Sequence, residues 1–209
     1  MNPSDNIRVI NPAAFLEQTD PDNRLAAYFD LLRSENRKIN LVSRETLGPD
    51  SGDNASLQAL AAESLLPLVQ PEIGNISRYL DIGSGGGFPA LPIMIIRQPD
   101  HAMLVERTQK KAGALRRILI GLGLTAAIEA RSFDELTLDT SFDLVTLRLV
   151  KLNPRLLKAI LRYLDDGAFL VYYSRPEFDP ASMGAESTTY YYTIGSDTTK
   201  KCFTLLKKV

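Results

Sequence analysis

Short apolar runs alternate with amphipathic stretches along the second half of the chain. The runs are brief enough for strands and cover residues 78–82, 101–106, 126–130, 142–147 and 168–173. Between them, apolar residues recur at helical spacing in segments that begin at Pro89, span residues 108–122 and begin again at Pro154. Such repeated strand–helix units predict a doubly wound α/β fold, in which helices cover both faces of a mostly parallel sheet.

An antiparallel pair is predicted to complete the sheet. Residues 188–194 and 202–206 have the composition of strands, and Gly195-Ser196-Asp197 supplies a turn between them. Together with the five runs above, this pair predicts a sheet of seven strands.

The first part of the chain has a helical pattern instead. Asp20 can cap a helix, Pro21 suits its first turn, and apolar residues follow at helical spacing from Leu25. A loop rich in small and polar residues spans 43–54, and a second helix follows over 57–68. We therefore divide the chain into an N-terminal helical extension with its loop, residues 1–54, and an α/β domain, residues 55–209.

The composition is that of an ordinary globular protein, with 209 residues, 44% hydrophobic, and a net charge of −1. No stretch approaches the ~18 unbroken apolar residues of a membrane span, and the N-terminus lacks the pattern of a secretion signal. The single Cys202 excludes an internal disulfide, and with the single His101 it cannot make a Cys/His zinc site. We expect a monomeric protein of the reducing cytoplasm, without a metal. A nucleic-acid role would need locally concentrated Lys and Arg.

The most informative segment is the glycine-rich stretch from Asp81 to Phe88, D-I-G-S-G-G-G-F. A glycine loop between a strand and a helix lets the backbone pass close to a ligand and directs free N–H groups at anionic oxygen atoms. Glu106, at the end of the next strand, can accept hydrogen bonds from both hydroxyls of a ribose. A dinucleotide fingerprint would need a third glycine where Phe88 stands, so the spacing favours S-adenosylmethionine. A glycine turn without a ligand is the alternative.

Four segments together carry a resemblance to a known family. They are N-R-K-I-N-L-V-S at residues 36–43, the loop with its two prolines at residues 81–92, Glu106 followed by Lys110-Lys111, and Phe142-Asp143 followed by Arg148. From about residue 24 onward the chain resembles the bacterial 16S rRNA guanine-N7 methyltransferases of the glucose-inhibited division protein B type. The resemblance implies a seven-stranded S-adenosylmethionine-dependent methyltransferase fold, S-adenosylmethionine as cofactor, and 16S rRNA or the small ribosomal subunit as substrate.

The sequence also departs from the pattern of that family. Leucines flank Arg148 where the family has Ser and Ala, Tyr173-Ser174 replaces Lys-Gly, and Ala59-Leu60 replaces Arg-His. Ala90 stands in for a glycine. The cofactor loop is therefore kept, while polar groups on the expected substrate side are not. Two alternatives stay open: a relative that binds cofactor or RNA without turnover, and a methyltransferase for a small molecule.

The resemblance also supplies the candidate site. The cofactor-binding candidates are Asp81, Gly83, Ser84, Gly85, Gly87, Phe88, Glu106, Ser132, Phe133 and Arg148. Ser132 and Phe133 follow the third strand, where relatives contact the adenine ring, and Asp81 either approaches the methionine amino group or orients the glycine loop. Arg148 is the catalytic candidate, because a guanidinium at a strand end can hold a carboxylate, a phosphate or a base edge; a structural ion pair is its alternative. Guanine N7 has a free lone pair, so no general base is required.

Basic residues gather on two predicted helices in spite of the net charge. They are Arg107, Lys110, Lys111, Arg116 and Arg117 for the first helix, and Lys151, Arg155, Lys158 and Arg162 on or before the second. They form either a side that faces phosphates or the solvated faces of amphipathic helices. Tyrosines at residues 172–173 or 190–192 would offer stacking surfaces for an extruded base, although strand tyrosines more often pack inside.

Overall fold

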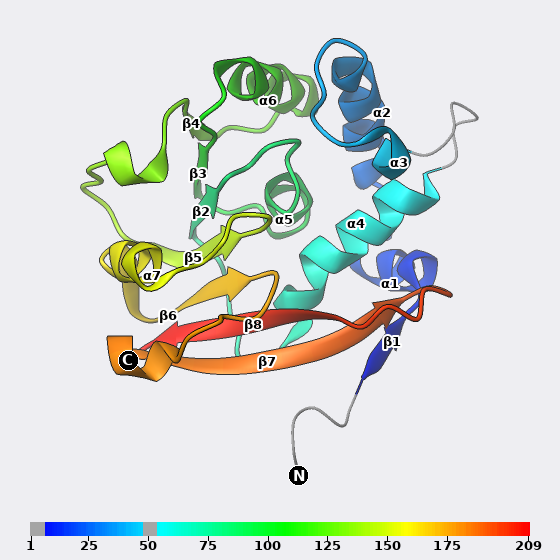
Figure 1. Cartoon of the computed structure of the whole chain (residues 1–209). Helices are drawn as coiled ribbons and strands as arrows, with labels where there is room; N and C mark the ends of the chain where they lie inside the picture. Colours follow the sequence, from blue (N-terminus) through cyan, green and yellow to red (C-terminus); the bar gives the residue numbers. More distant parts are fainter. Residues whose placement is uncertain (1–6, 48–53) are drawn as a thin grey trace.

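The computed structural model describes residues 7–47 and 54–209, which build one twisted sheet covered by helices (Figure 1). The strands are β1 (Arg8–Ile10), β2 (Arg78–Ile82), β3 (His101–Val105), β4 (Ala127–Glu129), β5 (Phe142–Leu147), β6 (Leu164–Tyr172), β7 (Ala185–Ile194) and β8 (Lys201–Lys208). Their order is β1-β7-β8-β6-β5-β2-β3-β4. Strands β4, β3, β2, β5 and β6 are parallel, whereas β8 is antiparallel to both β6 and β7. The predicted doubly wound α/β fold is confirmed.

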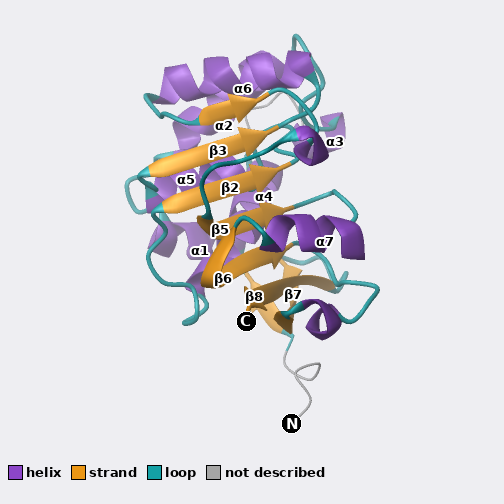
Figure 2. Ribbon diagram, turned by 90° about the vertical axis from the view of Figure 1, so that its left-hand side faces the viewer, coloured by secondary structure: helices purple, strands orange, loops and turns teal. Residues whose placement is uncertain are grey.

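Helices lie on both faces of the sheet (Figure 2). They are α1 (Pro12–Thr19), α2 (Leu25–Asn36), α3 (Arg44–Leu47), α4 (Ala55–Leu65), α5 (Ala90–Arg97), α6 (Gln109–Leu122) and α7 (Pro154–Leu161). Side chains alternate along the central strands between two apolar cores. Tyr79 of β2 belongs to the core that also contains residues of α1, α2, α4, α5 and α6, whereas its neighbour Leu80 belongs to the core that contains residues of α7. Both faces of β2 are thus buried, as in other parallel sheets.

Strand β2 lies where the winding of the sheet reverses. Strands β3 and β4 follow on one side of β2, and β5 and β6 lie on its other side. The loops after β2 and β5 therefore lead away in opposite directions at the carboxyl edge of the sheet. Figure 2 shows the arrowheads of β2 and β3 pointing to one edge, at which α3 also lies. In open α/β sheets, the crevice at such a reversal is the place where ligands bind.

The strand boundaries agree with the prediction in the middle of the sheet and differ at its margin. Strands β2 and β5 begin and end as predicted. The described residues form eight strands instead of seven, because β1 pairs in parallel with β7 at the edge. Strand β6 begins at Leu164, four residues before the predicted run at residues 168–173, and its pairing with β5 is irregular between Phe142 and Leu144.

The N-terminal helices also differ from the prediction. Helix α1 was not predicted, and α2 begins at Leu25 because the Asp20 carboxylate accepts hydrogen bonds from the amides of Arg24 and Leu25, both at 2.9 Å. Within the loop expected at residues 43–54, residues 44–47 form α3, and residues 48–53 lie outside the described part of the chain.

Helix α2 is firmly joined to the α/β part of the chain. Glu35 forms an ion pair with Arg117 of α6 at 2.6 Å, and Leu31 lies 2.9 Å from the position of a Cβ on Gly121. Helices α1, α2 and α4 share one apolar core with α5 and α6. The N-terminal segment therefore covers the same sheet face as α5 and α6, and it reaches the edge at which a ligand is expected.

Candidate active site

A cavity of about 930 Å³ opens at the carboxyl edge of β2, β3 and β5. Segments that follow these strands line it, together with residues 41–43 and 46 of the N-terminal segment. Of the predicted cofactor-binding residues, those that line the cavity are Gly83, Ser84, Gly85, Phe88, Glu106, Ser132, Phe133 and Arg148. Asp81 and Gly87 do not line it. The sequence motifs thus converge on one cavity from four separate segments of the chain.

The loop after β2 needs glycine for two different reasons. Gly83, Gly85 and Gly87 have φ angles of 82°, 52° and 96°, a region that L side chains rarely adopt. Gly83 and Gly87 also have no room, because a Cβ on them would lie 2.6 Å from Val150 Cγ2 and 2.7 Å from Leu91 Cδ1, respectively. Among the described residues, a Cβ on Gly85 would meet only the Gly83 carbonyl oxygen, at 3.7 Å. Gly85 is therefore the glycine at which the backbone is open to a ligand.

Glu106 is tied to this loop at the end of β3. Its carboxylate is buried, with Oε2 accepting a hydrogen bond from Gly85 N at 2.9 Å and Oε1 accepting one from Thr108 N at 2.7 Å. A carboxylate can accept about four hydrogen bonds, so further positions remain on each oxygen. Glu106 thus has two roles open to it: it orients the glycine loop, and it offers acceptors to a ligand in the cavity.

Asp81 lies buried at the carboxyl end of β2, with 1% of its surface exposed. Thr146 of β5 donates a hydrogen bond to Oδ1, whereas Oδ2 is buried and has no partner among the described residues. Burial raises the pKa of Asp81 to about 6, although the hydrogen bond from Thr146 opposes this change. A buried acceptor without a donor is costly unless a ligand completes it, and a cationic group would suit this carboxylate best.

Arg148 is placed both for the ligand role and for the structural ion pair that were its two predicted alternatives. It lines the cavity, and its Nη2 also forms an ion pair with Oε2 of the buried Glu63 of α4 at 3.0 Å. Lys201 of β8 binds the other oxygen of Glu63 at 2.5 Å. Because 16% of the Arg148 side chain is exposed, it is anchored on one side and accessible from the cavity. The ion pair and the ligand role are therefore compatible.

The N-terminal segment supplies one wall of the cavity, a role that was not predicted from its sequence. Asn36 Oδ1 accepts hydrogen bonds from the amides of Leu41 and Val42, at 2.7 and 2.9 Å. These two residues press on the glycine loop, because a Cβ on Gly86 would lie 2.8 Å from Val42 Cγ1. Tyr28 of α2 donates to the Gly86 carbonyl at 2.8 Å. The signal was present in the N-x-x-x-N-L stretch from Asn36, to which no role had been assigned.

The predicted basic clusters divide between two roles. The members that line the cavity are Arg107, Lys111, Lys151 and Arg155. Others are used within the fold: Arg117 pairs with Glu35, and Arg116 donates to the Ile128 carbonyl at 3.0 Å. None of the tyrosines considered for base stacking lines the cavity; Tyr173 donates to the Ser64 carbonyl, and Tyr190 stacks on Phe203 with ring centroids 5.0 Å apart.

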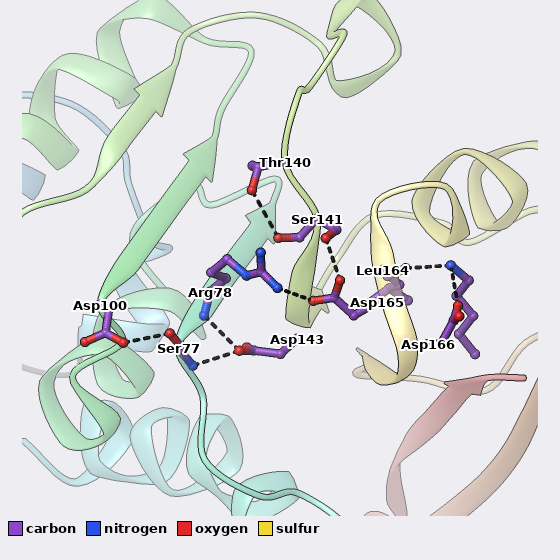
Figure 3. Close-up of polar contacts among 10 residues, drawn as sticks. Ser77, Arg78, Asp100, Thr140, Ser141, Asp143, Leu164, Asp165 and Asp166 are labelled. Atoms are coloured by element: carbon purple, nitrogen blue, oxygen red, sulfur yellow. Dashed lines mark hydrogen bonds and ion pairs between the residues drawn. The ribbon is translucent and has the colours of Figure 1, made fainter.

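A second polar group lies at the opposite, amino edge of the sheet (Figure 3). There Asp143 Oδ2 accepts hydrogen bonds from the amides of Ser77 and Arg78, both at 2.9 Å, and the Arg78 guanidinium pairs with Asp165 at 2.7 Å. These contacts tie β2, β5 and β6 together. Within residues 7–47 and 54–209, no group of three or more His, Cys, Asp or Glu residues is placed to hold a metal, and no helix is both long and apolar enough to cross a membrane.

The described chain has the α/β fold of solved methyltransferase structures. The O-methyltransferase from Bacillus cereus in complex with SAH superposes with a TM-score of 0.61 at 15% identity, covering 87% of this chain and 90% of that chain. The O-methyltransferase TomG from Streptomyces achromogenes, in complex with SAM, gives 0.57 at 17% identity, with the same coverages of 87% and 90%. At these identities the likeness concerns the fold.

The chain belongs to the rRNA small subunit methyltransferase G (GidB) family, whose model matches residues 22–179. It is similar to ribosomal RNA small subunit methyltransferase G of Sorangium cellulosum, with 38% identity over 61% of this chain and 53% of that protein. The protein of the same name from Rhodospirillum centenum is 33% identical over 77% of this chain and 70% of its own length. The chain thus spans little more than half of the first relative. The family resemblance inferred from the sequence motifs is confirmed.

Proposed function

We propose that the chain is an S-adenosylmethionine-dependent methyltransferase that modifies N7 of a guanine in 16S rRNA, acting on the small ribosomal subunit in the cytoplasm. The observation that carries this proposal is the contact between Glu106 and the glycine loop, in which Gly85 N and Glu106 Oε2 are 2.9 Å apart and both residues line the cavity. Membership of the rRNA small subunit methyltransferase G family supports the choice of RNA as substrate.

The residues around the cavity fit this cofactor. Glu106 uses one acceptor position of each oxygen on Gly85 and Thr108, and its remaining positions suit the two hydroxyls of a ribose. Asp81 does not line the cavity, so its buried and unpartnered Oδ2 would act on the cationic amino group at the methionine end through a bridging water. Ser132 and Phe133, which line the cavity after β4, would contact the adenine ring.

The proposed reaction does not require a general acid or base from the protein. S-adenosylmethionine, when bound, supplies a methyl group on a sulfonium centre that is open to in-line displacement. Guanine N7 already carries a lone pair, so the protein has to align the two reactants and exclude water. The described residues that line the cavity accordingly include no His and no Cys. Arg148 would hold the cofactor carboxylate, an RNA phosphate or the base edge with its planar guanidinium.

The test is methyl transfer to purified small subunits from cells that lack the gene. Wild-type protein with labelled S-adenosylmethionine should create an N7-methylguanosine in 16S rRNA that is absent before the reaction, and Glu106→Ala should create far less of it. An unchanged N7-methylguanosine map, despite binding of S-adenosylmethionine, would contradict the RNA activity. A protein that binds NAD and ignores S-adenosylmethionine would overturn the cofactor assignment as well.

A further inference from the structure

Leu149, which follows Arg148 after β5, combines two unusual features at the cavity. The residue is 95% exposed, and its backbone has a φ of 58°, in the left-handed region that leucine rarely adopts. The described chain exposes other large apolar side chains, namely Ile7, Val9, Val69, Ile120 and Val209, but Leu149 is the member of this set that lines the cavity. Strained backbone of this kind gathers at functional sites, where the surrounding structure holds it in place.

The structure around Leu149 fixes this conformation. Leu147 and Leu152 are buried on either side of it, and Tyr173 N donates to the Leu147 carbonyl at 3.0 Å. Between them, Val150 packs on the glycine loop so closely that its Cγ2 would lie 2.6 Å from a Cβ on Gly83. The segment is therefore anchored before and after Leu149. Nothing about Leu149's own packing requires a large apolar residue there, because its side chain lies in solvent.

We infer that Leu149 contacts the face of the target purine base at the mouth of the cavity. This inference deepens the proposed function and rests on it. A leucine side chain offers neither a charge nor a hydrogen bond, so among the parts of an RNA it suits the flat face of a base and not a phosphate or a ribose hydroxyl.

The surroundings of Leu149 favour the same occupant. The aromatic residues of the cavity, Phe88 and Phe133, are each only 7% exposed, which leaves Leu149 as the prominent apolar group at its mouth. Lys111 and Arg155 line the same cavity with cationic side chains that suit the flanking phosphates. An extruded base needs an apolar surface to replace the stacking that it loses, and Leu149 is placed beside Arg148 to provide one.

The test compares three variants in single-turnover methyl transfer to small subunits, with S-adenosylmethionine affinity and melting temperature measured in parallel. Leu149→Gly fits the left-handed backbone without strain, so the melting temperature should stay equal or rise. Its transfer rate at limiting subunit concentration should fall at least about fivefold, as expected for a lost contact with a base, at unchanged cofactor affinity. Leu149→Met should keep most of the activity. Ile120→Ala, the control on α6, removes a side chain that is 79% exposed and remote from the cavity lining, and should change nothing.

The outcomes separate this inference from the proposed function. If wild-type protein methylates the subunit and Leu149→Gly is as fast, the contact with the base is wrong and the proposed function stands. A Leu149→Gly variant with a lower melting temperature, or with cofactor affinity reduced as much as its transfer rate, would show a structural or cofactor role and would also overturn the inference. If wild-type protein transfers no methyl group to any RNA, the proposed function itself fails.

Discussion

Two buried carboxylates near the glycine loop are stabilised in different ways. Glu106 accepts an amide hydrogen bond on each oxygen, at 2.9 and 2.7 Å, whereas Asp81 has one oxygen bound to Thr146 and the other without a partner among the described residues. Glu106 is thus satisfied before any ligand arrives. Asp81 carries an unfavourable charge that a bound cation would relieve.

Asp81 should make the ligand-free protein less stable as the pH rises. Burial raises its pKa to about 6 from an ordinary 3.8. The pKa of Asp81 is higher in the folded protein than in the unfolded chain. Its favourable contribution to the free energy of unfolding is therefore complete below pH 3.8 and is lost as the pH rises through about 6. The full difference corresponds to roughly 3 kcal/mol. Asp81→Asn should therefore flatten the dependence of melting temperature on pH between 4 and 7 and raise stability at neutral pH. Parallel curves for the two proteins would contradict this.

The rate of methyl transfer should depend on the planar shape of the Arg148 side chain and not only on its positive charge. Arg148→Lys preserves the positive charge beside Glu63 but loses the planar fork of the guanidinium. We expect at least about a tenfold loss in methyl transfer, equivalent to ~1.4 kcal/mol in the barrier, with the fold intact. Single-turnover rates and cofactor affinity decide the role. A matching loss of affinity assigns Arg148 to the cofactor carboxylate, and intact affinity assigns it to the substrate. Full activity would leave only the ion pair.

Among the elements, the glycine loop stands out because it is held from both sides. Glu106 of the β3 end binds it from one side, and Tyr28 with Val42 of the N-terminal segment press on Gly86 from the other. The loop geometry therefore depends on segments far apart in the sequence. Adjacent glycines in it consequently have different roles, one toward the cavity and one toward the N-terminal segment.

Alanine substitutions at Gly85 and Gly86 should differ in whether they weaken cofactor binding as well as stability. Gly85→Ala places a Cβ in open space at a φ of 52°, so it should cost about 1–2 kcal/mol of stability and weaken S-adenosylmethionine binding at least about tenfold. Gly86→Ala should mainly destabilise the ligand-free protein, because its Cβ would lie 2.8 Å from Val42 Cγ1 and 3.1 Å from the Leu41 carbonyl oxygen. Calorimetry of unfolding and of cofactor binding checks both. Equal stability losses with equal binding would contradict this division of roles.

The elements that could be predicted are those whose own residues determine them. Strands β2 and β5 have the short, largely apolar composition of buried strands and were predicted to the residue, and the Gly83–Phe88 loop was located from its spacing. Strand β1 was not predicted because a segment of three residues is too short to show a hydrophobic periodicity, and its hydrogen bonds depend on β7. The start of β6 was missed because only Leu164 pairs with β5 before Phe169. Between them, Gly167 of the Asp165-Asp166-Gly167 segment has a φ of 77°, which is typical of a turn.

The same distinction applies to the site. Glu106 and Arg148 were identified because they stand at strand ends in recognisable motifs. Glu63, the partner of Arg148, lies 85 residues earlier in the chain, and the hydrogen bond between Thr146 and Asp81 joins two different strands. Neither contact could be derived from local spacing in the sequence. The cavity wall at Leu41 and Val42 likewise depends on how α2 packs against α6, which is a tertiary property.

On the scale of the whole molecule, charge is unevenly distributed between the two edges of the sheet. The chain has a net charge of −1, yet Arg107, Lys111 and Arg155 line the cavity, with no ion pair to any residue in the described ranges. Two acidic residues, Glu106 and Asp134, also line the cavity. At the amino edge, Figure 3 shows Asp100, Asp143, Asp165 and Asp166, where Arg78 and Lys208 pair with Asp165 and Asp166. A protein with a net negative charge can therefore present a cationic surface at the mouth of its cavity, as the proposed RNA substrate requires.

This distribution predicts which cations of α7 contact RNA. Arg155 lines the cavity, whereas Lys158 on the same helix is exposed but does not line it. Arg155→Ala should weaken binding to small subunits and reduce the slope of log affinity against log salt by about 1, because one phosphate contact and its released counterion are lost. Lys158→Ala removes a positive charge at a similar exposure and should leave the slope unchanged. Binding measured between about 50 and 200 mM salt compares the three proteins. Equal reductions in both variants would mean that the net charge of the molecule, and not the cationic mouth of the cavity, governs its attraction to RNA.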